Sequence, residues 1–209
     1  MDKKYCIMDM DGTLIDSMPY WNTLSPDYLK SRGITKSTEG LVDILRTMTM
    51  PLACDYLKKE YDLPESSEEI LVQLNDVMRR HYEFDIPLKK GVREHLDELS
   101  SKGARLCVVT ATALPLVRLC LKRLGVIEYF SFLMSCEEVG CGKDRPDAFL
   151  EAARRLDAAP GDIYVYEDSL TALQTARETG FRTVAVYDPY SGGWEQCRQI
   201  ADETITDWV

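Results

Sequence analysis

The sequence has no long hydrophobic run and no dense stretch of lysine or arginine. Its first residues, MDKKYCIMDMDGTLIDS, hold only a short apolar stretch interrupted by acids, so they match neither a signal peptide nor a membrane-spanning helix. We therefore expect a cytoplasmic protein with no membrane partner. With 25 Lys and Arg against 35 Asp and Glu, the net charge is -10, which repels the backbone of nucleic acids and disfavours a nucleic-acid partner.

The sequence also lacks the residue pairs that hold a structural zinc ion. Its seven cysteines are scattered without a CxxC pair, and the nearest two, Cys136 and Cys141, lie far along the chain from the two histidines, His81 and His95. Several cysteines sit in apolar runs such as YCIM and LCVV, where a reduced thiol behaves as a small hydrophobic residue. We expect core thiols rather than a zinc site.

What is present is the composition of a globular protein: 209 residues, 45% of them hydrophobic, with ordinary numbers of glycine and proline. Short β-rich runs alternate with longer helical patterns, and this alternation predicts an α/β fold, a Rossmann-like doubly wound parallel sheet with helices on both faces. Gly103, Gly125 and Gly180 stand where a left-handed residue ends a helix. The predicted strands are 4–8, 105–109, 130–134, 163–166 and 183–186, and the predicted helices are 91–102, 114–124, 146–157 and 169–179.

One interval breaks this rhythm. Residues 17–85 contain no convincing strand but show helical periodicity in EGLVDILRTM, PLACDYLKKEY and SEEILVQLNDVMRRHYEF. About 69 residues of helix are too many for a crossover between neighbouring strands, so we expect an inserted helical domain at 17–85. Residues 1–16 and 86–209 then form the α/β core.

Acidic residues follow the first predicted strand directly. Asp9 and Asp11 are two apart in extended chain, so both carboxylates can reach one spot, and Gly12 allows a tight turn there. Two anions this close must share a cation or a proton. A DG pair alone often just ends a strand, but the apolar run before DxDGT and the third acid at Asp16 favour a functional site.

Three other strand ends carry polar side chains. Thr110 ends the strand 105–109, and its hydroxyl with the N–H groups of Ala111 and Thr112 is suited to an anion, although Thr112 could simply cap a helix. Lys143 lies in a glycine-rich loop, where a lysine is usually just solvated. The strand IYVY is followed by Glu167 and Asp168, which could merely favour the next helix dipole.

The convergence of these four positions matters more than any one of them. All follow predicted parallel strands, and ligands of doubly wound sheets bind at the carboxyl ends of the strands. Carboxylates for a hard cation such as Mg2+, a hydroxyl with backbone donors, and one lysine form a coherent set for phosphoryl transfer.

With these motifs in view, the chain resembles the haloacid dehalogenase-like superfamily over essentially its whole length. DMDGTLIDS is similar to the first motif of that superfamily, VVTAT to the second, the lysine of GKDRPDAF to the third and YEDS to the fourth. The insertion after the first motif resembles the helical cap of phosphoglycolate phosphatases and of sugar-phosphate phosphatases and mutases. Many relatives have Lys-Pro in the third motif, whereas Asp144 follows Lys143 here.

The resemblance implies a role for each matching residue. Asp9 would be the nucleophile that becomes an aspartyl-phosphate, and Asp11 the general acid and base. Mg2+ would be held by Asp9, the Asp11 carbonyl, Asp168 and Glu167, while Thr110, the Ala111 N–H and Lys143 would bind the phosphoryl oxygens. The implied activity is a magnesium-dependent phosphatase acting on a small phosphorylated metabolite.

Two alternatives stay open. A phosphosugar mutase shares the chemistry, but the best-known mutases of this type have a histidine where this chain has Trp21. A receiver-like signalling module is also phosphorylated on an aspartate. The order of motifs here, with DxD first and ED last, counts against that module. Within the cap, the specificity candidates are Trp21, Arg46, Thr47 and Thr49. Substrate identity and oligomeric state are left open by the sequence.

Overall fold

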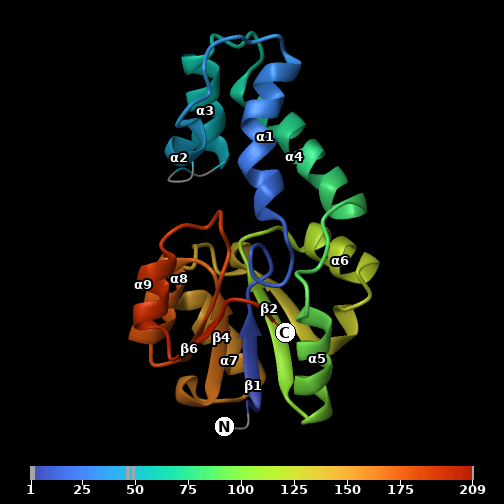
Figure 1. Cartoon of the computed structure of the whole chain (residues 1–209), viewed down its shortest axis with the longest axis vertical. Helices are drawn as coiled ribbons and strands as arrows, with labels where there is room; N and C mark the ends of the chain where they lie inside the picture. Colours follow the sequence, from blue (N-terminus) through green and yellow to red (C-terminus); the bar gives the residue numbers. More distant parts are fainter. Residues whose placement is uncertain (1–2, 46–47, 49, 209) are drawn as a thin grey trace. The chain divides into compact units, whose positions relative to one another are not determined.

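A computed structural model describes residues 3–45, 48 and 50–208 of the chain (Figure 1). Two compact units are present: one comprises Met1–Met18 and Ile86–Val209, and the other Pro19–Asp85. The first boundary follows Met18, two residues later than the boundary expected after residue 16. The second follows Asp85, at the expected position. The roles of core and cap remain predictions for these two units.

The first unit is built on a six-stranded sheet in the order β3-β2-β1-β4-β5-β6, with every neighbouring pair parallel (Figure 1). The α/β Rossmann-like fold is therefore confirmed. β1 lies between β2 and β4, so their carboxyl ends come together at one edge of the sheet. The strands are β1 (Tyr5–Met8), β2 (Arg105–Thr110), β3 (Phe130–Ser135), β4 (Ile163–Glu167), β5 (Arg182–Val186) and β6 (Glu203–Ile205).

Helices cover both faces of this sheet. α7 and α8 pack on the face that carries Ile7, Cys107 and Val165. Neighbouring residues of a strand point to opposite faces. Tyr166 therefore faces the other side, where its ring meets His95 of α5 at 5.6 Å between centroids. The helices of this unit are α5 (Val92–Ser101), α6 (Leu114–Arg123), α7 (Asp147–Leu156), α8 (Leu170–Glu178) and α9 (Trp194–Ile200), with single 3-10 turns at Ile127–Tyr129, Cys136–Glu138 and Pro160–Asp162.

The predicted helix ends are largely as expected. Gly103, Gly125 and Gly180 all have positive φ, between 66° and 90°, which confirms the left-handed endings. α7 instead ends at Asp157, a non-glycine residue with φ of 54°. All seven cysteines are free thiols and six of them are buried, as expected of core thiols; Cys141 is half-buried.

The second unit consists of helices: α1 (Met18–Ser31), α2 (Leu41–Leu45), α3 (Met50–Glu60) and α4 (Ser67–Phe84). α4 begins with a capping box, in which the Ser66 hydroxyl accepts from the N–H of Glu69 and the Glu69 carboxylate accepts from the N–H of Ser66. Its buried residues Ile70, Leu74 and Met78 recur at helical spacing on one side. No helix in the described part of the chain is long and apolar enough to cross a membrane.

Candidate active site

The first motif forms a tight loop at the end of β1. The N–H groups of Leu14 and Ile15 both donate to the carbonyl of Met10, at 2.9 and 3.0 Å, and Gly12 donates to Ile15 at 3.1 Å. Gly12 has φ of 78°, a conformation that favours glycine. The loop brings Asp9, which is 7% exposed, to the carboxyl edge of the sheet beside β4, where its N–H donates to the carbonyl of Tyr166.

Lys143 joins Asp9 to Glu167. Its ammonium group forms an ion pair with the Asp9 carboxylate and another with Glu167 at 2.5 Å, and its side chain is 10% exposed. Burial alone would lower the pKa of Lys143, but the charges of Asp9 and Glu167 raise it above its usual range. The lysine is therefore a fixed positive charge. Asp144 in place of proline does not prevent the loop from delivering Lys143 to the acids.

The carboxylates of this site carry more negative charge than Lys143 balances. Burial raises the pKa of Asp9 well above its ordinary value, and the charges of Glu167, Asp168 and Asp11 act in the same direction against the opposing charge of Lys143. Burial and the charge of Glu167 likewise raise the pKa of Asp168 to about 7. A second cation would relieve this repulsion.

Three of the four predicted metal ligands come together. Ligand oxygens of Asp9, Glu167 and Asp168 lie within 4.8 Å of one another, and all three residues are buried. Carboxylate oxygens at this separation suit a hard divalent cation such as Mg2+. The donor set fits such an ion. The Asp11 carboxylate is not part of this group, and metal binding by the Asp11 carbonyl stays a prediction.

The Asp11 side chain instead accepts a hydrogen bond from the Thr112 hydroxyl at 2.8 Å. Both residues are half-buried. The N–H of Thr112 in turn donates to the Thr110 hydroxyl oxygen at 3.1 Å. Accepting this bond uses a lone pair of the Thr110 hydroxyl, and its proton can still donate to an anion. Thr112 is therefore not the helix cap that the sequence offered as an alternative: the N-cap of α6 is Ala113, and the Thr112 hydroxyl bonds Asp11 instead.

Asp168 is held by two hydroxyl groups that the sequence analysis did not select. Thr13, within the first motif, donates to Oδ1 at 3.1 Å, and Ser191 donates to Oδ2. The position of Thr13 four residues after Asp9 was a usable signal, since the DxDGT loop turns back on itself. Ser191 lies in the loop after β5 and carries no such signal.

The specificity candidates of the sequence all belong to the inserted segment. Trp21 of α1 is half-buried, and its indole N–H donates to the Tyr82 hydroxyl of α4 at 3.3 Å, which is a packing role inside the helical unit. Arg46, Thr47 and Thr49 lie outside the described residues. The N–H of Asp16 donates to the carbonyl of Pro87.

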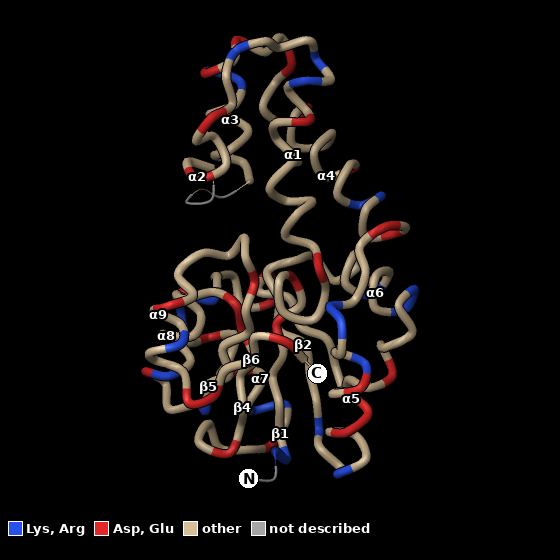
Figure 2. The backbone as a smooth tube through the Cα atoms, viewed as in Figure 1, with Lys and Arg blue, Asp and Glu red and all other residues tan. Residues whose placement is uncertain are grey.

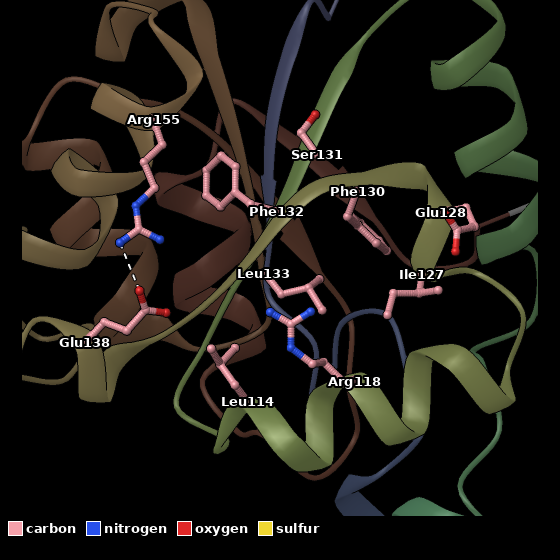
Figure 3. A pocket seen from close by; sticks show the side chains of 10 residues that line it. All are labelled: Leu114, Arg118, Ile127, Glu128, Phe130, Ser131, Phe132, Leu133, Glu138 and Arg155. Carbon is pink, nitrogen blue, oxygen red and sulfur yellow. Dashed lines mark hydrogen bonds and ion pairs between the residues drawn. The ribbon is translucent and has the colours of Figure 1, made fainter.

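An open pocket of about 480 Å³ lies at the edge of the sheet along β3, with none of the motif residues in its lining (Figure 3). Arg118 of α6 and Arg155 of α7 reach toward it from opposite sides, and Arg155 is paired with Glu138 at 2.9 Å. Acidic and basic residues are interspersed along both units (Figure 2). The candidate catalytic and metal-binding side chains lie in the buried acidic cluster and not in the lining of this pocket.

Comparisons with a family model, with curated proteins and with solved structures all find similar proteins. The family model described as haloacid dehalogenase-like hydrolase matches residues 6–186. The chain is 30% identical to a Drosophila melanogaster protein named probable pseudouridine-5'-phosphatase, over 88% of this chain and 82% of that one. It is 28% identical to phosphoglycolate phosphatase of Nitrosococcus oceani, over 90% and 85%. The solved structure of beta-phosphoglucomutase from Clostridium difficile superposes with a TM-score of 0.74 at 16% identity, covering 98% and 91% of the two chains.

Proposed function

The chain belongs to the haloacid dehalogenase-like hydrolases, and from that premise we propose that it is a magnesium-dependent phosphatase of a small phosphorylated metabolite that works through an aspartyl-phosphate on Asp9. The observation that carries the proposal is the buried cluster of Asp9, Glu167 and Asp168 with Lys143 paired to two of its members. Such a cluster provides a nucleophile, a cation site and a fixed positive charge in one place.

Asp9 is the nucleophile. Its carboxylate attacks the phosphorus, the bond from phosphorus to the leaving oxygen breaks, and water later attacks the acyl-phosphate to release inorganic phosphate and free Asp9. The covalent route divides one difficult displacement into two easier ones. Lys143 stays beside Asp9 through both steps because it is anchored on Glu167 as well.

Asp11 transfers the protons. In the first step its carboxyl group protonates the leaving alkoxide, and in the second its carboxylate takes a proton from the attacking water. The Thr112 hydroxyl, at 2.8 Å from Oδ2, orients that carboxyl group.

The transferring phosphoryl group is bound by the second motif and Lys143. The Thr110 hydroxyl and the N–H of Ala111 donate to its oxygens, and Lys143 supplies positive charge. A bound Mg2+, held by Asp9, Glu167, Asp168 and the Asp11 carbonyl, would neutralise the charge that spreads over the phosphoryl oxygens.

The substrate class is a sugar phosphate or a phosphoglycolate-like monoester. The names of the similar proteins support this class, because each of the phosphatases cited above acts on a small phosphorylated molecule. The second candidate is a phosphosugar mutase, favoured by the structural likeness to a beta-phosphoglucomutase. Trp21 counts against it, since its indole is committed to Tyr82 and offers no base. A cytoplasmic location is part of the proposal.

The test is the Asp9→Asn variant assayed with p-nitrophenyl phosphate and Mg2+. We expect hydrolysis to be abolished, because the amide is not a nucleophile, while the circular dichroism spectrum is unchanged. The matched control is Asp162→Asn, an exposed aspartate of the same unit, which should keep full activity. Full activity of Asp9→Asn would end the proposal.

A substrate panel then separates the two candidates. Sugar phosphates, phosphoglycolate and nucleotides are incubated with the wild-type protein and Mg2+, and free phosphate is measured beside the isomerisation of a hexose 1-phosphate. Phosphate release without isomerisation supports the phosphatase, and isomerisation with little phosphate release supports the mutase.

A further inference from the structure

The loop that follows β5 reaches the acidic cluster. Residues 187–193, YDPYSGG, connect β5 to α9 and lie outside all four motifs. The hydroxyl of Ser191 donates to Oδ2 of Asp168. Because β5 lies next to β4 in the sheet, this loop and Asp168 emerge from adjacent strand ends. A fifth strand end thus contributes a side chain to the site.

Ser191 completes the hydrogen bonding of Asp168. Oδ1 accepts from Thr13 at 3.1 Å, and Oδ2 accepts from Ser191, so the carboxylate is held from both sides. Each carboxylate oxygen has two lone pairs and can accept a hydrogen bond and still bind a cation. Hydrogen-bond partners of this kind orient metal ligands, and their removal typically lowers metal affinity or activity by about 10- to 100-fold.

The local backbone explains how Ser191 arrives there. The N–H of Tyr190 donates to Oδ1 of Asp188 at 2.8 Å, which tightens the turn just before Ser191. Gly192 and Gly193 follow with φ of 74° and 67°, a succession that residues with a side chain rarely adopt. The chain therefore turns sharply on both sides of Ser191, and the hydroxyl points back to Asp168.

A buried ion pair fixes this loop to another segment of the same unit. The ammonium group of Lys89 lies 2.8 Å from Oδ2 of Asp188 and donates to the carbonyl of Tyr187, also at 2.8 Å. The side chain of Asp188 is fully buried and that of Lys89 is 13% exposed. Lys89 itself is held to the first-motif loop, because its N–H donates to the carbonyl of Leu14 at 3.0 Å.

We propose that Ser191 is a positioning residue for Asp168 in divalent-cation binding and that the Lys89–Asp188 ion pair holds Ser191 in place. The inference rests on the proposed cation site, and it adds a residue and an anchor that no motif of the chain contains. Ser191 acts through Asp168 rather than on the substrate. The effect should therefore appear in cation binding measured without any substrate.

The experiment is calorimetric titration of Mg2+ into the full-length protein. Ser191→Ala should weaken Mg2+ binding about tenfold, while Ser191→Thr, which keeps the hydroxyl, should bind within about twofold of wild type. The matched control is Ser131→Ala, an exposed serine on β3, which should bind as wild type does. Mg2+ affinity of Ser191→Ala equal to that of the control would overturn the proposal.

The anchor is tested by the double variant Lys89→Met with Asp188→Asn, which removes both charges together and so avoids leaving one buried charge unpaired. The asparagine oxygen can still accept from Tyr190. We expect weaker Mg2+ binding in this double variant, and no further loss when Ser191→Ala is added, because both changes release the same hydroxyl contact. If Ser191→Ala weakens Mg2+ binding by the same factor in the double variant as in the wild-type protein, the Lys89–Asp188 ion pair does not hold Ser191 in place.

These outcomes are separable from those of the proposed function. If wild-type protein binds Mg2+ and Ser191→Ala weakens that binding, the positioning role stands even if no phosphomonoester is hydrolysed. If hydrolysis depends on Asp9 but Ser191→Ala binds Mg2+ normally, the phosphatase stands and the positioning role does not.

Discussion

Gly12 and Asp168 lie so close that no side chain fits between them. A Cβ placed on Gly12 would be 2.9 Å from Cγ of Asp168 and would overlap its Oδ2. Gly12 of the first motif is therefore needed to leave room for the carboxylate of Asp168 in the fourth motif. Its positive φ and the lack of a Cβ are both required at this position.

Gly12→Ala should lower activity by about 10- to 100-fold, because the added methyl group must displace the Asp168 carboxylate, a proposed ligand of the cation. The measurement is kcat/KM for p-nitrophenyl phosphate together with Mg2+ affinity. Gly103→Ala is the matched control: Gly103 has φ of 74° in the same unit, and a Cβ there meets nothing within 4 Å. It should lose stability through backbone strain but keep its activity. Equal kcat/KM in the two variants would contradict this account.

Lys143→Met should lower kcat/KM by about 100- to 1000-fold, the range seen when one preorganised donor is removed from a transition state. The change also leaves Asp9 and Glu167 without their buried cation. Steady-state kinetics with p-nitrophenyl phosphate give the effect. Lys102→Met removes a lysine whose ion pair with Glu98 is exposed, and it should change kcat/KM by less than twofold.

Asp11→Ala should slow the hydrolysis of alkyl phosphates more than that of p-nitrophenyl phosphate. An aryl leaving group departs without protonation, whereas an alkoxide needs the acid. Thr112→Val removes the hydroxyl that orients Asp11 and should give the same leaving-group dependence with smaller losses. The ratio of kcat/KM for the two substrates is the measurement. An unchanged ratio in Asp11→Ala would argue against its role as the acid.

Mg2+ binding should weaken as the pH falls below 7. Burial and the charge of Glu167 raise the pKa of Asp168 to about 7, so in the cation-free protein a proton occupies this carboxyl at pH 6 and must leave when Mg2+ binds. We expect roughly tenfold lower affinity at pH 6 than at pH 8, with proton uptake by the buffer. Calorimetry in buffers of different ionisation enthalpy measures both, and equal affinity at the two pH values would contradict it.

The same shift sets the sign of a stability change. Because the folded-state pKa of Asp168 lies above its unfolded value of 3.8, the folded protein binds more protons between those limits. The unfavourable contribution of this carboxylate is therefore greatest above pH 7 and declines as the pH falls through 7 toward 4. Mg2+ should accordingly raise Tm more at pH 8 than at pH 6, which thermal unfolding with and without the ion will show.

Much of the fold was predictable because most of its strands are short apolar runs separated by helical patterns. β1, β2 and β4 are nearly all buried, and such runs stand out in a sequence. β6 was missed because it is three residues long and mostly exposed. α1 was missed because Pro26 lies within it and only Leu24, Tyr28 and Leu29 are buried, which leaves a weak periodic pattern.

Some residues of the candidate site could likewise be predicted from the sequence and others could not. Asp9, Lys143 and Asp168 follow strands of a parallel sheet and Glu167 ends β4, and the order of strands brings them together. Ser191 could not be selected, because a serine before two glycines is typical of any turn. Its contact with Asp168 depends on the pairing of β5 with β4 and on the ion pair between Lys89 and Asp188, which are 99 residues apart.

The two ends of the inserted segment leave the first unit side by side. Ile15 and Leu88 form an antiparallel bridge, and the N–H of Asp16 donates to the carbonyl of Pro87 at 3.0 Å. In topological terms the whole helical unit occupies the place of a hairpin loop. All strands of the sheet and all residues of the acidic cluster belong to the first unit, so helices of another length or number could be accommodated at the insertion while its two ends stay paired. The length of the insertion is thus free to vary, while the loop of the first motif is constrained by the close approach of Gly12 to Asp168.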